Sequence, residues 1–382
     1  MTVDQLIEAG NTCREQNNPE EALKFYAQAF TLDRKSASAF NNYGNVLREL
    51  GEPDSSLPFL QRSIQLAPQA ATPNFNLAVA YLLLGNYVQG WPQYEHRWNF
   101  EHLAGTLPQH SQPRWVGQDL KNKTLLVVQE QGLGDTIQFV RFLFALHTAG
   151  AKIILQVNDN LAPLFAGSAV IEKIVDINQQ VTNFDYWIPI MSIPGVLGVT
   201  LENLPHQLQY LSASATAIKE WQARLGAKKQ LRVGFCWSGR TDSWINRHKS
   251  MPFEIMLDLI KSKPHHEWIN LQVECSEEQQ QILQQHGVKC FNSQIRNFAD
   301  TAGLIHHTDV VISVDTAVAH LSGAMGRPTW IPLNCYGTDW RWLLDRDSSP
   351  WYPACRLFRQ GNMGDWTPVI QRIAQYLDWF KV

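Results

Sequence analysis

The pattern of apolar and polar positions changes near residue 123. Up to residue 98, small and apolar residues recur at helical spacing. After residue 123, short apolar runs alternate with helical segments. Because such alternation is typical of parallel sheets covered by helices, the pattern predicts a helical N-terminal module followed by α/β sequence.

The helical part repeats at a fixed interval. Gly10, Gly44 and Ala78 are each 34 residues apart, and Pro68 closes the second unit. This is the period of tetratricopeptide repeats, in which small residues let paired helices approach closely. We therefore predict a tetratricopeptide module over residues 1–100, with two clear repeats and a partial third.

The third unit carries an aromatic stripe. Trp91, Tyr94 and Trp98 lie three and four residues apart, and therefore on one helix face. We expect this stripe to cap the repeats against the next domain, and an aromatic ligand box is the alternative. Polar, proline-containing sequence follows, so residues 101–123 are predicted to be a linker.

Apolar runs of strand length predict two series of parallel strands after the linker. The first comprises residues 124–129, 152–157 and 173–177, and the second comprises 231–237, 267–273, 288–292, 309–314 and 328–333. Helices are expected at 135–148, 276–286, 298–306 and 317–325.

These elements predict two Rossmann-like, doubly wound halves over residues 124–228 and 229–382, so the predicted fold class is α plus α/β. A proline-containing loop and one helix at 201–230 would connect the halves. Ligands of open parallel sheets bind beyond the carboxyl ends of the strands. The predicted site is therefore a cleft between the two sheets.

Composition narrows the function classes. The 382 residues are 45% hydrophobic, enough for two or three domains, and the net charge of −3 disfavours nucleic acid as a partner. Six scattered cysteines without a C-x-x-C pair fit reduced thiols better than a zinc site. No apolar run approaches membrane-spanning length and no signal-like segment opens the chain, so we expect a cytoplasmic protein without a membrane span.

The stretch QEQGLGDTIQ (129–138) lies where a strand should turn into a helix. Gln131, Gly132 and Gly134 form its loop, and the glycines permit close approach of another molecule. A dinucleotide fingerprint would need glycine at position 137, where Ile137 stands, so an NAD-linked oxidoreductase is disfavoured. Asp135 at the helix start would repel a bound phosphate, and it is either a helix cap, a general base or both.

A second turn, ISVDTAVAHLSGAMGRP (312–328), offers a different chemistry. The amides of residues 316–319, including Ala317, and the Thr316 hydroxyl could seat a phosphate at a helix start. Asp315 should then point away from the phosphate, and His320 lies one turn further along the same face. Helix cap for Asp315 and buried core residue for His320 are the alternative interpretation.

Basic side chains follow the first strand of the second half. Arg240, Arg247 and Lys249 fall in the loop 236–252, together with His248, where they could neutralise a leaving diphosphate. Gln272, at the end of the next strand, could meet a nucleotide base.

Five stretches carry a further resemblance, and together they cover nearly the whole chain. They are GWPQYEHRW (90–98), EQGLGDTIQFVRF (130–142), FADTAGLIHHTDVVISVDTAVAHLSGAMGRPTWI (298–331), DWRWLLDRDSSPWYP (339–353) and RLFRQGNMGDW (356–366). The chain resembles bacterial tetratricopeptide-repeat proteins fused to a glycosyltransferase domain related to family 9, the heptosyltransferases.

The resemblance implies a GT-B fold and inverting, metal-independent transfer of a sugar from a nucleotide-diphosphate sugar, with no other cofactor. It implies Asp135 as general base and Asp315, Thr316 and His320 as donor-binding residues. A C-terminal helix at 367–380 is expected to cross back to the first half. The repeats indicate a protein or peptide partner.

Two other functions compete with this one. A metal-dependent transferase could use the D-x-D triplet Asp345–Arg346–Asp347, although a charged surface loop is the plainer interpretation. A non-catalytic scaffold could bind partners through the repeats and retain a sugar-nucleotide-binding fold.

Overall fold

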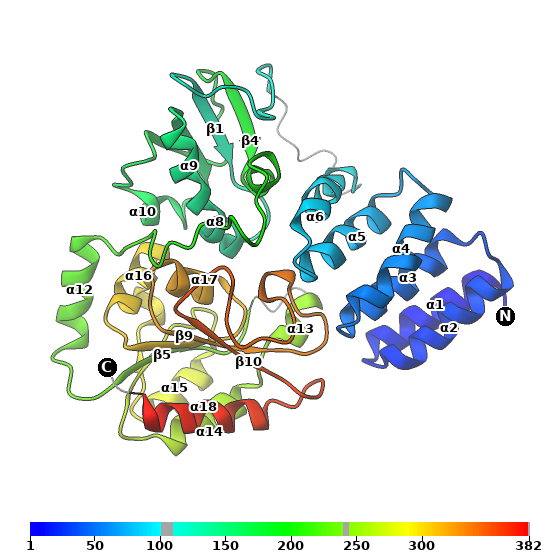
Figure 1. Cartoon of the computed structure of the whole chain (residues 1–382). Coiled ribbons are helices and arrows are strands. Elements are labelled where there is room, and N and C mark those ends of the chain that lie inside the picture. Colours follow the sequence, from blue (N-terminus) through cyan, green and yellow to red (C-terminus); the bar gives the residue numbers. More distant parts are fainter. Residues whose placement is uncertain (101–109, 240–243, 381–382) are drawn as a thin grey trace. The chain divides into compact units, whose positions relative to one another are not determined.

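The computed structural model describes residues 1–100, 110–239 and 244–380 (Figure 1). The described residues form two compact units. The repeat unit comprises the N-terminal helices together with Gly198–Leu204 and Cys335–Asp345. The α/β unit comprises the described residues of His110–Leu197, Pro205–Asn334 and Arg346–Val382.

The described residues of the repeat unit form three helical hairpins. Its helices are α1 (Val3–Glu15), α2 (Pro19–Leu32), α3 (Ala37–Glu49), α4 (Pro53–Leu66), α5 (Ala71–Leu83) and α6 (Tyr87–Tyr94), followed by the 3₁₀ helix η1 (Glu95–Asn99). A Cβ at Gly10 would lie 2.4 Å from a ring carbon of Tyr26, so the small residue is what lets α1 and α2 pack. The predicted helical repeats and their partial third unit are confirmed.

Trp91 of the aromatic stripe is covered by two segments that return from later in the chain. Trp91 donates its indole N–H to the Val199 carbonyl at 2.9 Å, and its ring meets that of Trp340 edge-on at 5.5 Å. Glu49 on α3 accepts hydrogen bonds from the Tyr336 hydroxyl at 2.6 Å and from the Gly337 amide at 2.7 Å. The stripe was expected to cap the repeats against the next domain. Trp91 is instead covered by segments 198–204 and 335–345, which belong to the repeat unit although the division by sequence had placed both with the α/β halves.

The first sheet of the α/β unit is wholly parallel, in the order β3-β2-β1-β4. Its strands are β1 (Thr124–Val128), β2 (Lys152–Val157), β3 (Lys173–Asp176) and β4 (Tyr186–Pro189). Its helices are α8 (Leu133–Phe139), η2 (Val140–Phe142), α9 (Leu143–Thr148), α10 (Ala162–Phe165), η3 (Ile190–Ser192) and α11 (Ile193–Val196). β4 was not predicted, because a four-residue run that ends in proline gives little strand signal.

The second sheet is also parallel, in the order β10-β9-β8-β5-β6-β7. Its strands are β5 (Arg232–Cys236), β6 (Glu267–Asn270), β7 (Lys289–Cys290), β8 (Val310–Ser313), β9 (Thr329–Leu333) and β10 (Cys355–Arg359). The remaining helices are α12 (Ala215–Leu225), α13 (Trp244–Lys249), α14 (Phe253–Ser262), α15 (Glu277–Gln285), η4 (Asn292–Gln294), α16 (Phe298–His306), α17 (Ala317–Ala324), η5 (Trp340–Trp342) and α18 (Thr367–Trp379). The predicted fold class, helical repeats followed by two parallel-sheet halves, is confirmed.

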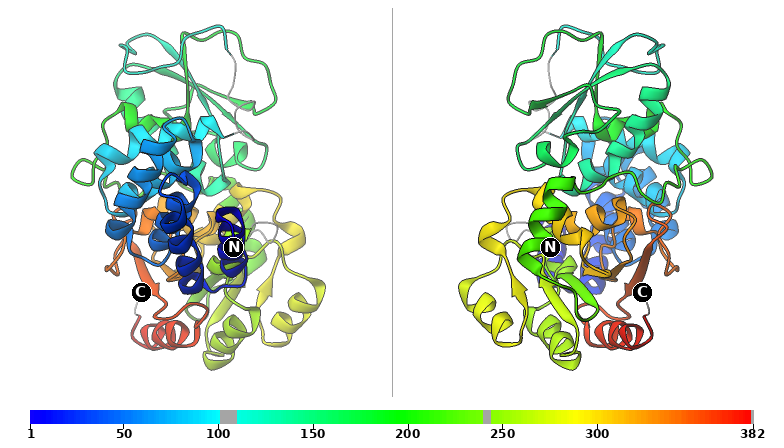
Figure 2. Two further views of the ribbon diagram at one scale, coloured as in Figure 1. Left: turned by 90° about the vertical axis from the view of Figure 1, so that its right-hand side faces the viewer. Right: turned by 90° about the vertical axis from the view of Figure 1, so that its left-hand side faces the viewer.

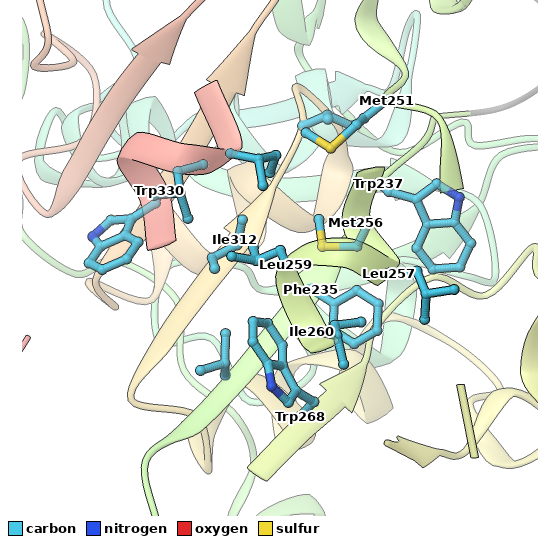
Figure 3. Close-up of a cluster of buried hydrophobic side chains, with 14 of the residues drawn as sticks. Phe235, Trp237, Met251, Met256, Leu257, Leu259, Ile260, Trp268, Ile312 and Trp330 are labelled. Atoms are coloured by element: carbon cyan, nitrogen blue, oxygen red, sulfur yellow. The ribbon is translucent and has the colours of Figure 1, made fainter. Parts of the chain in front are cut away.

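The C-terminal helix corrects one prediction. α18 packs against α14, β9 and β10 of its own half and does not cross back to the first (Figures 1 and 2). Its apolar face, with Val369 and Ile373 fully buried, joins the core of the second half. Figure 3 shows part of this core, where Met256 and Ile260 of α14 lie beside Phe235. α18 packs on its own half because this core buries the apolar face of the helix.

None of the helices in the described part of the chain is both long enough and apolar enough to cross a bilayer.

Candidate functional site

Asp135 lies at the start of α8, directly beyond the carboxyl end of β1. Its Oδ2 accepts a hydrogen bond from the N-cap amide of Gly132 at 2.8 Å. The side chain is partly exposed. Asp135 is therefore a helix cap, and because a carboxylate offers about four lone-pair positions, the cap does not by itself exclude a second role.

The residues before Asp135 shape the turn. Gln131 is exposed and has a φ of 59°, a left-handed conformation that costs a non-glycine residue energy. Glu130, which was not among the predicted residues, accepts a hydrogen bond from the Met191 amide at 2.9 Å and so ties this turn to η3, directly after β4. The loop predicted on the acceptor side is thus held from two strands of the first sheet.

Gly134 brings the first turn against the second. A Cβ at this position would lie 2.7 Å from Cδ2 of His320, 3.3 Å from the Ala317 Cα and 3.6 Å from the Ala317 amide nitrogen. Only glycine leaves this space in front of α17 open. The structure therefore places the predicted turns from the two sheets side by side, and α8 packs on α17.

The start of α17 differs from that of α8. Thr316 is the N-cap residue, but its side chain makes no capping hydrogen bond. Its Oγ1 lies 3.0 Å from the Ser313 hydroxyl and 3.8 Å from the thiol of Cys236. The first-turn amides are therefore left uncapped by Thr316, as an anion seat requires.

Asp315 is a buried, paired carboxylate. Its side chain is 5% exposed, with the Lys249 ammonium 2.6 Å from Oδ2 and Nε2 of His320 3.6 Å from Oδ1. Burial acts to raise the pKa of this carboxyl, but the charge of Lys249 and the contact with His320 outweigh burial and hold the pKa well below its usual range. Asp315 is thus ionised and neutralised by its partners, which weakens its repulsion of an anion at the neighbouring amides.

His320 is buried between two partners. Its Nδ1 lies 2.8 Å from the hydroxyl of Tyr352, and its opposite edge faces Asp315 and Gly134. The residue is therefore both a satisfied buried histidine and a wall of the site. Sequence reasoning missed Tyr352, and its only signal was the Trp-Tyr-Pro stretch at 351–353.

Gln272 has a supporting position. Its side-chain oxygen accepts hydrogen bonds from the Ser238 amide at 3.0 Å and from the Cys236 thiol at 3.1 Å. The side chain therefore fixes the loop after β5, and its oxygen points at these donors. A contact with a nucleotide base, as expected from the sequence, would have to come from its other atoms.

The structure shows the contacts of one of the predicted basic residues. Lys249 reaches Asp315, whereas Arg247 on α13 is exposed. Arg240 lies outside the described residues. Only Lys249 of the three is shown in the site.

The aspartates of the D-x-D triplet lie on the surface. Asp347 is exposed and pairs with Arg356 at 3.0 Å, and Asp345 is exposed too. Within residues 1–100, 110–239 and 244–380, no group of three or more His, Cys, Asp or Glu side chains could hold a metal ion.

Comparisons with known proteins identify the N-terminal repeats and a relative over most of the chain. The tetratricopeptide repeat family matches residues 6–36 and 37–69, so the N-terminal helices are tetratricopeptide repeats. Protein FlbA of Caulobacter vibrioides is 26% identical over 431 residues, covering 95% of this chain and 71% of that protein.

Two solved structures are similar to the remainder of the chain. ADP-heptose lipopolysaccharide heptosyltransferase II of E. coli matches at 14% identity with a TM-score of 0.49, covering 67% of this chain and 98% of the other. The glycosyl transferase family 9 protein of Veillonella parvula matches at 11% identity with a TM-score of 0.48, covering 70% of this chain and 92% of the other.

Proposed function

We propose that this protein is a glycosyltransferase that moves a sugar from a nucleotide-diphosphate sugar to a hydroxyl group. One observation carries the proposal: Gly134, the chain neighbour of the partly exposed Asp135, lies against the start of α17, where the N-cap side chain of Thr316 makes no capping hydrogen bond. The Asp135 carboxylate can act as a base that takes a proton, and the amides at the start of α17 can bind a departing anion.

The donor side would use α17. The amides at its first turn, from Ala317 on, and the Thr316 hydroxyl would bind the diphosphate. Lys249 would add positive charge, because an ammonium has three donors and one bond to Asp315 does not exhaust them. Gly134 keeps the approach to these amides open.

The chemistry proposed is a single in-line displacement. The acceptor oxygen bonds to the anomeric carbon while the bond from that carbon to the diphosphate breaks, and the diphosphate leaves with the electron pair. Asp135 takes the proton of the acceptor hydroxyl, and the configuration at the anomeric carbon inverts. The amides and the ammonium take the developing negative charge, so no metal ion is required.

The repeats support a protein or peptide acceptor, since tetratricopeptide modules present extended surfaces for other chains. Radiolabelled donor incubated with the full-length protein and a cell extract tests this, because the label should enter protein rather than lipid. Label confined to lipid would contradict a protein acceptor and leave the transferase proposal standing.

Release of nucleoside diphosphate from a panel of nucleotide sugars tests the transferase itself. In excess chelator, the wild-type protein should turn over one of them, and Asp135→Asn should not. Asp54→Asn is the matched control, since Asp54 is an exposed carboxylate in the first turn of α4. Turnover that needs a divalent ion contradicts the metal-independent mechanism. If the wild-type protein turned over none of the donors, the non-catalytic scaffold would be favoured.

A further inference from the structure

A buried arginine lies behind the site. Arg141 in η2 is 1% exposed. It donates to the Trp351 carbonyl at 2.7 Å, to the Tyr210 hydroxyl at 3.0 Å and to the Gln138 carbonyl at 3.0 Å. One guanidinium thus joins the first sheet's helix to the connecting segment and to the loop that precedes β10.

The same guanidinium fixes aromatic rings. Its central carbon lies 4.7 Å from the ring centre of Tyr210, 4.8 Å from that of Tyr352 and 5.3 Å from that of Trp351. Such contacts are attractive, and more so away from water. On another side, a Cβ at Gly323 would lie 2.6 Å from the Tyr352 ring, so α17 packs directly against it. Tyr352 therefore has little freedom to move.

The Tyr352 hydroxyl meets His320 at 2.8 Å from Nδ1. Burial raises the pKa of Tyr352 well above its ordinary value, so the phenol keeps its proton and can donate it. On the other side of the imidazole ring, Nε2 of His320 lies 3.6 Å from the carboxylate of Asp315. A lone pair on Nε2 would be repelled by this carboxylate, whereas an N–H would be attracted.

We propose that Tyr352, held by Arg141, is a positioning residue that donates to Nδ1 of His320 and so keeps the imidazole proton on Nε2. His320 then presents an N–H to Asp315 and keeps its Cδ2 edge against Gly134, which fixes the start of α17 relative to the α8 turn. The His320 tautomer is a property of the protein without ligand. Its effect on nucleotide binding rests on the function proposed above.

Nitrogen-15 NMR of the full-length protein with labelled histidine tests the tautomer directly. The His320 signals are assigned by their loss in His320→Gln. In the wild type they should show the proton on Nε2, and in Tyr352→Phe they should shift toward a mixture of tautomers. Tyr376→Phe is the matched control, since Tyr376 lies on α18 and packs against Trp330 and Phe358.

Binding of ADP and of UDP to the same variants measures the consequence. Tyr352→Phe should weaken the binding of whichever nucleotide the wild type binds by about tenfold, the worth of one buried hydrogen bond, and Tyr376→Phe should not. A proton on Nδ1 in the wild type, or tautomer signals that Tyr352→Phe leaves unchanged, would overturn the inference. Absence of nucleotide binding by the wild type would instead count against the proposed function, while the wild-type spectrum still decides the tautomer.

Discussion

The two halves of the α/β unit each place an aspartate at a strand-to-helix turn, and the two carboxylates have opposite situations. Asp135 is partly exposed and accepts a hydrogen bond from the amide of Gly132 in its own turn. Asp315 is almost fully buried and is paired with Lys249 and His320. In the first turn, the Asp135 carboxylate accepts a hydrogen bond from the N-cap amide of α8. In the second turn, the side chain of the N-cap residue Thr316 makes no capping hydrogen bond.

In the mechanism proposed above, this difference lets one residue type serve two purposes. Asp135 caps its own helix and is partly exposed, so it would be able to meet an acceptor hydroxyl. A carboxylate that has lost its water must keep its cation, and it then stabilises the turn whose amides remain available. The comparison predicts that substitutions at the two aspartates fail in different ways.

The largest expected effect is on chemistry at Asp135. Asp135→Asn should lower the transfer rate about 10³-fold, because a general base contributes roughly 10²- to 10⁴-fold. Nucleotide binding should stay within about twofold, since the donor side is untouched. Steady-state kinetics and calorimetric titration measure the two. Equal loss of binding and rate would place Asp135 on the donor side and erase the contrast with Asp315.

Asp315→Asn should act on stability. Removing the carboxylate leaves the Lys249 ammonium with little solvent, and we expect a loss of about 3 kcal/mol in the free energy of unfolding at pH 7. The depressed pKa of Asp315 means that its stabilisation is present above its unfolded pKa and is lost as pH falls through the folded value. The difference between wild type and variant should therefore shrink below about pH 4. Urea denaturation across pH checks both points, and a difference that persists undiminished into acid would contradict the pairing.

Gly134→Ala tests the close approach of the two turns. The added methyl group would collide with His320 and the start of α17, so we expect a loss of about 2 kcal/mol in stability. Nucleotide affinity should fall by a similar energy. Gly361→Ala is the control, because a Cβ there would meet nothing within 4 Å. Equal behaviour of the two variants in denaturation and nucleotide titration would show that the turns are farther apart in solution.

Thr316→Val should have the smallest effect. The change keeps the shape of the side chain and removes the hydroxyl that lies 3.0 Å from Ser313, which costs about 1 kcal/mol. Nucleotide binding should weaken about fivefold if that hydroxyl also contacts the diphosphate. Titration of the variant with nucleotide measures this. Unchanged affinity would show that the first-turn amides bind the diphosphate without the Thr316 hydroxyl.

Much of the fold followed from local patterns. The 34-residue period placed the repeats, and the helix predicted at 298–306 coincides with α16 (Phe298–His306). α14 and β10 were not predicted, although the stretches at 236–252 and 356–366 that were singled out adjoin the first and overlap the second. The turns that carry Asp135 and Asp315 were found because glycine and aspartate after an apolar run mark helix starts.

The sequence alone determined the repeats, most strands of the two series and the residue types at the two turns, because periodicity and capping are properties of a few neighbouring residues. Only the tertiary structure decided that Lys249 pairs with Asp315 across 66 residues, that Tyr352 meets His320, and that α18 stays with its own sheet. Such pairings depend on which buried charges and apolar faces meet, and that is settled by the packing of the whole chain.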